Sequence, residues 1–253
     1  MRARAAALLV STAGTAAVAG CDRPIYLSFD TGHMGIAEAV VAVLDRHEVP
    51  ATFFLAAEPT QTGGHSLDEH WMPFWRRLAQ QGRHDFGSHT WEHAIWERDL
   101  PNGAMRFRLQ AGVQAPRWAT WDGAGYCTDL QRVADRFRAH TGQPLAPVFR
   151  APWGLTSPRL LHQAAGCGWT HVPWTRALGD DWASSRATNA ELLRQAIERM
   201  KPGDIVLAHL GIWSRQPPLL PEALEPLIRG LKARGFCFAA LRDHPQYRTV
   251  LRR

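Results

Sequence analysis

The sequence has no dense basic cluster, few cysteines and no long apolar run. Its 253 residues carry a formal charge of +6 at pH 7, but the Lys and Arg residues are scattered and never form a run of five or more. Nucleic-acid binders concentrate positive charge on one surface, so we expect no nucleic-acid partner. With 45% apolar and 21% charged residues, the composition is typical of a globular protein and excludes a disordered chain.

The N-terminal segment 1–20 has the pattern of a bacterial targeting sequence. It starts with two arginines and continues with small apolar residues, in a run too short for a comfortable transmembrane helix. It ends in Val-Ala-Gly-Cys21, which resembles a lipobox. We therefore expect 1–20 to be a signal peptide of the lipoprotein type, with an ordinary signal peptide or a start site placed too far upstream as the alternatives. Lipidation of Cys21 would anchor the mature protein in a membrane, in the bacterial periplasm or cell envelope.

The four cysteines are too few for a disulfide framework, and no two form a Cys-x-x-Cys motif. If Cys21 is lipidated, Cys127, Cys167 and Cys237 remain, an odd number that allows at most one disulfide. The apolar surroundings of Cys167 and Cys237 favour small core residues for both. Whether any of the three is bridged stays open at this point.

Hydrophobic patterning alternates between short apolar runs and amphipathic stretches, which predicts about seven β/α repeats. The predicted strands cover 25–29, 51–55, 84–87, 148–149, 170–174, 204–209 and 236–240, and the predicted helices cover 36–47, 67–81, 128–140, 158–165, 190–200 and 221–234. This order implies a parallel sheet with helices outside. Two stretches, 58–68 and 98–126, break the rhythm, and we interpret the longer one as a substrate-facing loop or lid.

Polar residues follow the ends of many predicted strands. They are Asp30, the pair His89 and His93, Arg150, the pair Asp180 and Asp181, and His209. Each has an ordinary structural alternative, such as a helix cap at Asp30 or a hydrogen-bonded strand end at His209. Together they favour a barrel over an open sheet, because barrel active sites form at the carboxyl ends of the strands. The predicted fold class is α/β, a distorted (β/α) barrel of about seven strands.

The histidine pair is the strongest single signal. On one helical turn, residues four apart project from the same face, so His89 and His93 are spaced to bind one divalent metal ion. Zn²⁺ is the first candidate, with Co²⁺ or Ni²⁺ as alternatives.

Five ordered motifs resemble those of polysaccharide deacetylases that carry the NodB homology domain, carbohydrate esterase family 4. They are Ser28-Phe-Asp-Thr-Gly32, His89-Thr-Trp-Glu-His93, Arg150-Ala-Pro-Trp-Gly154, Asp181-Trp182 and Leu207-Ala-His209. The fourth is incomplete, because Leu178 stands where the family has its leading Asp. The resemblance covers 25–245 and implies a NodB-type barrel, with 21–253 as a single catalytic domain.

The resemblance also implies roles for individual residues. His89 and His93 would hold the metal, Asp30 would be the general base, and His209 would be the acid that protonates the leaving amine. Arg150 would keep Asp30 ionised and oriented, because an adjacent cation lowers the pKa of a carboxyl group.

The acetyl pocket would have walls made by the side chains of Trp153, Trp182 and Leu207. Tyr126 or a backbone N–H would donate a hydrogen bond to the oxyanion that forms during hydrolysis, and no motif decides between them.

One departure from the family pattern concerns the third metal ligand. The family has an aspartate at the position of Thr31, and a neutral hydroxyl is a much poorer ligand than a carboxylate. Three outcomes are open: His33 replaces the aspartate, Asp30 itself binds the metal, or the site is weak or empty. We favour an active site with a rearranged third ligand and take His33 as the candidate.

The function expected from the sequence is metal-dependent removal of N-acetyl or O-acetyl groups from an envelope or extracellular polysaccharide. The alternative is a non-catalytic glycan-binding lipoprotein that has lost the metal. An amidase acting on a small amide would use the same chemistry. The presence of both Asp30 and His209 favours an enzyme, because a binding module does not need a paired base and acid.

Overall fold

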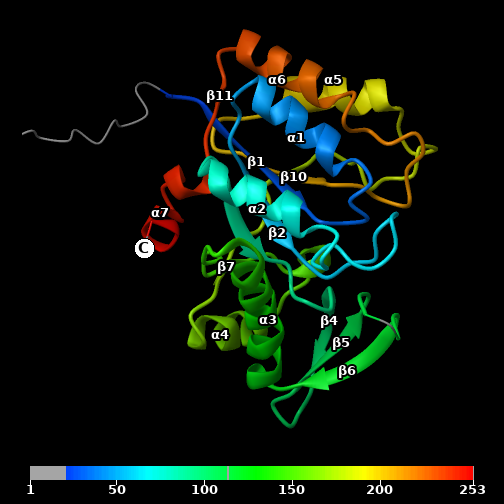
Figure 1. The fold of residues 1–253 in the computed structure, drawn as a ribbon, viewed down its shortest axis with the longest axis vertical. Coiled ribbons are helices and arrows are strands. Elements are labelled where there is room, and N and C mark those ends of the chain that lie inside the picture. The colour runs from blue at the N-terminus through cyan, green and yellow to red at the C-terminus, as the bar shows by residue number, and fades with distance from the viewer. Residues whose placement is uncertain (1–20, 113, 253) are drawn as a thin grey trace, which may run out of the picture.

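A parallel sheet forms the centre of the molecule, with helices packed outside it (Figure 1). The computed structural model describes residues 21–112 and 114–252, so the predicted signal peptide 1–20 lies outside the described residues. The strand order is β8-β7-β3-β2-β1-β10-β9, and β11 also pairs with β1. The bounds are β1 Pro24–Asp30, β2 Ala51–Leu55, β3 Asp85–Ser88, β7 Val148–Phe149, β8 Thr170–His171, β9 Arg176–Ala177, β10 Ile205–His209 and β11 Cys237–Phe238.

The sheet is strongly curved. Its two edge strands, β8 and β9, are consecutive in sequence and are joined only through 172–175. Such a connection spans at most about 18 Å, whereas a flat sheet of this order would separate its edges by about 29 Å. The edges must therefore approach each other, which confirms the predicted distorted barrel of about seven strands. The strand predicted over 170–174 ends at His171, since Pro173 cannot donate a hydrogen bond to a ladder, and the short strand β9 that follows was not predicted.

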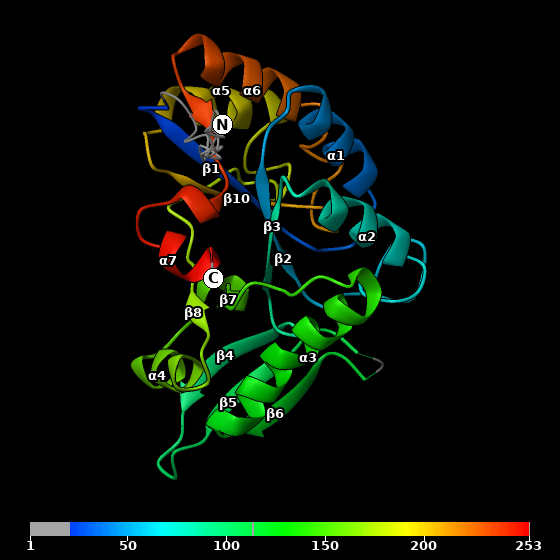
Figure 2. The same cartoon turned by 60° about the vertical axis from the view of Figure 1, so that its left-hand side comes forward.

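The helices form from the amphipathic stretches that the sequence predicts. They are α1 Ala37–Arg46, α2 Met72–Gln81, α3 Gly123–Thr141, α4 Pro158–Gly166, α5 Asn189–Arg199, α6 Leu224–Ala233 and the short α7 Arg248–Leu251. Helices α1, α5 and α6 lie together at one end of the molecule, and α3 and α4 lie at the other (Figures 1 and 2).

Two helix starts differ from the prediction because a carboxylate fixes each boundary. Helix α2 starts at Met72, later than predicted, because the Asp68 carboxylate accepts the N–H groups of His65 and His70 and closes a turn first. Helix α3 starts at Gly123, earlier than predicted, because Asp122 caps it by accepting the N–H of Gly125 at 2.8 Å.

The segment 98–126, predicted as a loop or lid, is largely a three-stranded antiparallel sheet instead. Strands β4 Ala94–Asp99, β5 Met105–Leu109 and β6 Arg117–Trp121 pair in sequence order and lie beside α3 (Figure 2). In β5 every second residue is buried and the residues between are arginines, which is the alternation of a strand with one buried face. The alternating pattern of β5 covers only five residues, too few to predict a strand within this long segment.

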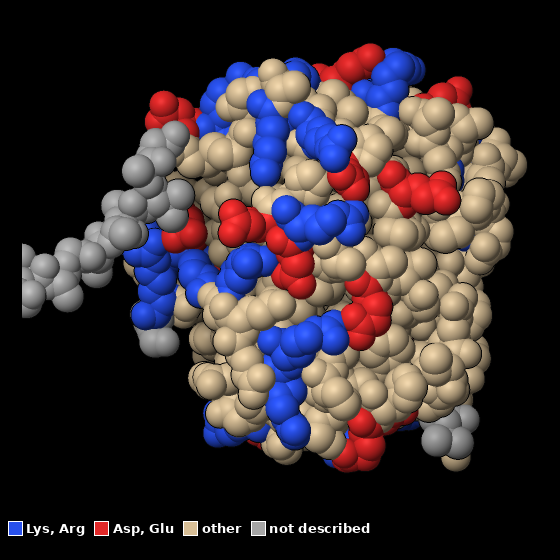
Figure 3. Space-filling model, turned by 45° about the horizontal axis from the view of Figure 1, so that its top comes forward, with Lys and Arg blue, Asp and Glu red and all other residues tan. Residues whose placement is uncertain are grey.

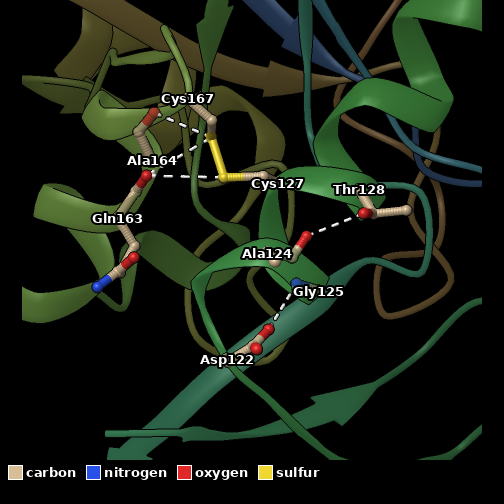
Figure 4. The surroundings of a disulfide bond; sticks show 8 residues. All are labelled: Asp122, Ala124, Gly125, Cys127, Thr128, Gln163, Ala164 and Cys167. Atoms are coloured by element: carbon tan, nitrogen blue, oxygen red, sulfur yellow. Dashed lines mark hydrogen bonds between the residues drawn. A yellow bond between two sulfur atoms is a disulfide. The ribbon is translucent and has the colours of Figure 1, made fainter.

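Two disulfides correct the interpretation of the cysteines. Cys21 pairs with Cys237, so its sulfur is not available for lipidation, and the prediction of a lipid-modified Cys21 is not supported. Cys127 in α3 pairs with Cys167 directly after α4 and ties these two helices together (Figure 4). Sequence spacing could not reveal these pairs, because partners lie up to 216 residues apart.

Acidic and basic side chains are intermixed on the surface over the α5 and α6 end (Figure 3). Many pair with each other, as Arg77 does with Glu38 and Arg46 with Glu225. No helix in the described part of the chain is long and apolar enough to cross a membrane.

Candidate active site

A cavity of about 630 Å³ opens at the carboxyl ends of the central strands, as a barrel active site requires. The residues that line it are Asp30, Glu58, His89, His93, Gln110, Trp153, Trp174, Asp181, Leu207, His209, Ile212, Trp213 and Ser214. Parallel pairing of β1 with β2 and β10 brings Asp30 opposite Phe54 and His209. The strand register therefore gathers side chains that are distant in sequence.

Asp30 is held by a buried ion pair. Its Oδ1 accepts a hydrogen bond from Arg150 Nη1 at 2.9 Å, and Arg150 Nη2 also donates to Ser28 Oγ at 2.7 Å. Arg150 is completely buried. Burial alone would raise the pKa of Asp30, but His89, Arg150 and His209 together hold this pKa below its ordinary value. Asp30 is thus an oriented, ionised carboxylate.

His89 and His93 share the cavity, but they lie in a turn and not on a helix. The turn needs left-handed backbone at Thr90 and His93, with φ of 62° and 45°. The Thr90 hydroxyl stabilises it by accepting the N–H of Ala94 at 2.7 Å. The two imidazole rings lie 4.9 Å apart between centroids. The pairing expected from helical spacing is present, but its geometry comes from a different local structure.

Hydrogen bonding leaves His89 Nε2 directed at Asp30. His89 Nδ1 lies 2.8 Å from the Arg150 carbonyl, which can only accept, so Nδ1 carries the proton. The other ring nitrogen, Nε2, lies 3.4 Å from Asp30 Oδ2. Burial lowers the pKa of His93 to about 4, so the His93 ring is neutral, the form in which histidine binds metals.

Glu58 is the residue that the sequence analysis missed at this site. It follows β2 and reaches the same cavity, where Oε1 lies 3.9 Å from His93 Nε2. Its Oε2 accepts hydrogen bonds from Thr31 Oγ1 at 2.6 Å and from Gly32 N at 2.7 Å. Burial favours a raised pKa, but His93, His89 and these hydrogen bonds hold the pKa of Glu58 below its ordinary value.

The donor set around the cavity fits a divalent cation in its chemistry. The Nε2 atoms of His89 and His93 lie 3.4 Å and 3.9 Å from carboxylate oxygens of Asp30 and Glu58. Imidazole nitrogens and carboxylate oxygens are both ligands that divalent cations such as Zn²⁺ take in proteins. Within residues 21–112 and 114–252, no three His, Cys, Asp or Glu side chains are close enough to hold a metal ion without adjustment. The potential ligands lie close together only in pairs, so side chains must move before three of them can bind one ion.

His209 ends β10 and is paired with Asp180. The Asp180 carboxylate accepts the His209 backbone N–H at 2.7 Å, and His209 Nδ1 lies 3.2 Å from both carboxylate oxygens. Burial alone would lower the pKa of His209, but Asp180, with Asp30 and Asp181, raises it to about 9. At neutral pH this ring is an imidazolium, which can donate a proton.

His33 is not among the described residues that line the cavity. Its Nδ1 accepts the N–H of Gly35 at 3.0 Å, and its Nε2 lies 3.4 Å from the Gln61 amide nitrogen. Its ring packs against Trp213, 4.7 Å away. Both nitrogens are occupied away from His89 and His93, because the turn after β1 directs the side chain to the side of Gly211.

The predicted substrate-binding residues divide into two pairs. Trp153 and Leu207 line the cavity, and Trp153 is 58% exposed there. The Arg186 guanidinium lies over the Trp182 ring, 4.0 Å from its centroid. Trp182 is not one of the described residues that line the cavity. Tyr126 is fully buried and stacks on Phe107 in the core, because β5 folds back over α3. The structure therefore does not place Tyr126 where it can reach an oxyanion.

Other residues of the site carried weak sequence signals. Asp180, the partner of His209, was visible as a polar residue after a strand, next to the predicted motif residue Asp181. Trp174 lay at the end of the predicted strand 170–174, and Trp213 lay outside the predicted strands and helices. Gln110 and Glu58 lay in the two stretches that break the rhythm, 98–126 and 58–68, and matched no motif.

An oriented carboxylate, an imidazolium and two further histidines that face one cavity define a hydrolytic site on a barrel. Residues 17–172 match the family model described as polysaccharide deacetylase, and the chain belongs to this family. It is thus a hydrolase of the class that acts on amide bonds, as the motifs predict. A chitooligosaccharide deacetylase of Azorhizobium caulinodans is 29% identical over 230 residues, covering 86% of this chain and 92% of that protein.

Solved structures show the same fold. A family 4 acetyl xylan esterase from Clostridium thermocellum, in complex with a cobalt ion, matches with a TM-score of 0.66 at 21% identity, over 90% of this chain and 93% of that one. A family 4 pseudoenzyme from Bacillus anthracis matches with a TM-score of 0.63 at 18% identity, over 88% of this chain and 65% of that one. Both likenesses support the barrel, and neither decides activity, because fold alone does not determine function.

Proposed function

We propose that this protein is a metal-dependent deacetylase that hydrolyses acetyl groups of an acetylated polysaccharide, with N-acetyl groups as the first candidate. The observation that carries the proposal is the presence of Asp30 and His209 in one cavity with His89 and His93. A non-catalytic glycan-binding protein has no need for an ionised carboxylate and an imidazolium beside a pair of histidines.

Each residue has a role that follows from its surroundings. His89 and His93 would hold a divalent cation, Zn²⁺ first and Co²⁺ or Ni²⁺ as alternatives, which supplies polarisation of the acyl carbonyl and acidification of water. Asp30, kept ionised by Arg150, accepts the proton of the attacking water. His209, kept charged by Asp180, donates a proton to the departing amine, which is a poor leaving group until it is protonated.

The cavity walls support a sugar substrate. Trp153, Trp174 and Trp213 line the cavity, and Trp153 and Trp213 are more than half exposed. Flat aromatic faces pack well against the apolar faces of sugar rings. The relative from Azorhizobium caulinodans is named a chitooligosaccharide deacetylase, so N-acetylglucosamine oligomers are the substrates to test first.

We propose further that the protein acts in the bacterial periplasm or cell envelope. The two disulfides support this location, since structural disulfides persist in oxidising compartments and are rare in the cytosol.

Acetate release tests the proposed function. The protein loaded with Zn²⁺, Co²⁺ or Ni²⁺ is expected to release acetate from chitooligosaccharides, peptidoglycan or acetylated xylan, and chelator treatment is expected to abolish the release until metal is restored. Acetate is measured by an enzyme-coupled assay and the products by mass spectrometry. Absence of release from all three substrates with every metal, together with glycan binding that survives His209→Ala, would support the non-catalytic alternative.

The pH dependence of the reaction is expected to follow the Asp180–His209 pair. The active form of His209 is protonated, so kcat/KM falls as the pH rises through the pKa of His209, about 9. In Asp180→Asn the carboxylate charge is lost, so the pKa of His209 is expected to fall toward 6.5, the ordinary histidine value. The decline of kcat/KM on the alkaline side of the profile, its alkaline limb, is then expected to begin at a lower pH. The measurement is a kcat/KM profile from about pH 6 to about pH 11.

Asp181→Asn is the matched control for this profile. Asp181 contributes less than Asp180 to the raised pKa of His209, so its replacement is expected to move the limb by a smaller amount. An alkaline limb that stays in place in Asp180→Asn would argue against His209 as the acid.

A further inference from the structure

A carboxylate occupies the space that the residue at position 31 leaves open. The motif that 28–32 resembles would place an aspartate at this position, and this chain has Thr31. The strands β1 and β2 are parallel neighbours, and Asp30 pairs with Phe54, so the segments after both strands leave the sheet side by side. Glu58 therefore enters from the segment after β2 toward the place where a side chain at position 31 projects.

The contacts of Glu58 fix its orientation. Its Oε2 is held by the Thr31 hydroxyl and the Gly32 N–H, at 2.6 and 2.7 Å. Thr31 is itself buried and positioned, because its Oγ1 accepts the N–H of Ala56 at 3.1 Å. With Oε2 held in this way, Oε1 is turned into the cavity and lies 3.9 Å from His93 Nε2.

Charge and distance favour a shared cation between Glu58 and the histidines. Two ligand atoms that each lie about 2.0–2.2 Å from one tetrahedral Zn²⁺ ion are about 3.3–3.6 Å apart. Glu58 Oε1 and His93 Nε2 are 3.9 Å apart, so the two side chains need to approach each other by only a few tenths of an ångström to share an ion. The hydrogen bonds of Glu58 all go to Oε2, and a cation between Oε1 and the imidazoles would also compensate the charge on the side that faces the cavity.

The two other candidates for the third ligand are arranged differently. Both nitrogens of His33 have partners outside the cavity lining. Asp30 has one oxygen held by Arg150 and the other 3.4 Å from His89 Nε2, and the proposed function assigns this carboxylate the role of general base. Glu58 is a second carboxylate with one oxygen anchored and the other directed into the cavity, and it lies beside His93.

We propose that Glu58 is the third metal ligand of this protein, and that Thr31 positions Glu58 in place of supplying a ligand itself. The inference rests on the proposed function to the extent that both require a metal at His89 and His93. Under this proposal the carboxylate ligand comes from the segment after β2, so the site needs no aspartate at position 31.

Metal binding tests this assignment independently of catalysis. The purified protein is stripped with a chelator, reloaded with Zn²⁺ or Co²⁺, and analysed for metal content by mass spectrometry, for Zn²⁺ affinity by competition titration, and for its Co²⁺ visible absorption spectrum. Glu58→Gln keeps the size and the hydrogen-bond acceptor but lacks the charge, and we expect it to weaken Zn²⁺ binding by at least about 100-fold and to change the Co²⁺ spectrum. Thr31→Val, which removes only the positioning hydroxyl, is expected to weaken binding by about 10-fold to 100-fold.

Two controls and a rescue complete the design. Glu38→Gln removes an exposed carboxylate outside the site, and His33→Gln removes the alternative ligand; both are expected to keep the parent Zn²⁺ affinity. The double variant Glu58→Gln/Thr31→Asp returns a carboxylate to position 31 and is expected to recover binding relative to Glu58→Gln. Thermal unfolding of the metal-free variants verifies that each is folded.

The outcomes separate this inference from the proposed function. If the parent protein binds no Zn²⁺ or Co²⁺, both the inference and the metal dependence of the proposed function are overturned. If the parent binds metal and Glu58→Gln binds it equally well with an unchanged Co²⁺ spectrum, only the assignment of Glu58 fails. A loss of metal in His33→Gln but not in Glu58→Gln would transfer the role to His33.

Discussion

Asp30→Asn is expected to lower kcat/KM by about 10²-fold to 10⁴-fold, the usual contribution of a general base. Asparagine has the same shape and can still accept a hydrogen bond from Arg150, but it cannot take a proton from water. The barrel is expected to stay intact, because the backbone of Asp30 remains paired with β2 and β10. Steady-state deacetylation with a chitooligosaccharide measures the loss.

Metal content separates the two roles open to Asp30. A base contributes little to metal affinity, so Asp30→Asn is expected to retain its Zn²⁺, whereas loss of the metal together with activity would make Asp30 a ligand. The matched control is Asp135→Asn, which removes an exposed carboxylate of α3 that accepts only a Gln131 side-chain bond. Its kcat/KM is expected to stay within about twofold of the parent value, as is usual for surface substitutions outside functional sites.

Arg150→Met is expected to lower the free energy of unfolding by about 3–5 kcal/mol, because it leaves the buried Asp30 carboxylate without its partner. The guanidinium is completely buried, donates to Asp30 and Ser28, and lies 4.2 Å above the Phe54 ring. Methionine fills part of the volume but supplies neither charge nor donors. Urea unfolding followed by circular dichroism measures the change.

Two comparisons identify the cause of that destabilisation. Arg77→Met breaks an exposed ion pair with Glu38 and is expected to cost about 0–1 kcal/mol. The double variant Asp30→Asn/Arg150→Met removes both charges and is expected to be more stable than Arg150→Met alone. A double variant that is less stable by the full sum of the two single effects would show that no coupling exists between Asp30 and Arg150.

The order of strands and helices could be predicted because the hydrophobic periodicity is a local property. Strand β2 was predicted with its observed bounds, and α1, α4, α5 and α6 each within a few residues. The three-stranded sheet β4-β5-β6 could not be predicted, because its short strands gain stability from pairing with one another and from packing near α3. Likewise the histidine turn depends on positive φ angles that the sequence pattern does not show.

The candidate site was predicted where the residues belong to linear motifs. Asp30, Arg150 and His209 were predicted from their motifs, and the structure places them at the carboxyl edge of the sheet. Asp180 and Glu58 could not be assigned, because their partners lie 29 and 27 residues away along the chain. Only the register of β9 with β10 brings Asp180 to His209, as only the register of β1 with β2 brings Glu58 to Thr31.

The sequence by itself determined the barrel, the family and the pairing of base, acid and histidines, since these depend on local periodicity and on ordered motifs. The sequence also shows that position 31 has no aspartate, which indicates that a metal ligand is missing there. Only the tertiary structure shows that the Glu58 carboxylate lies beside Thr31. A parallel sheet brings the ends of neighbouring strands together whatever their distance in sequence, so a carboxylate after β2 can lie beside a threonine after β1.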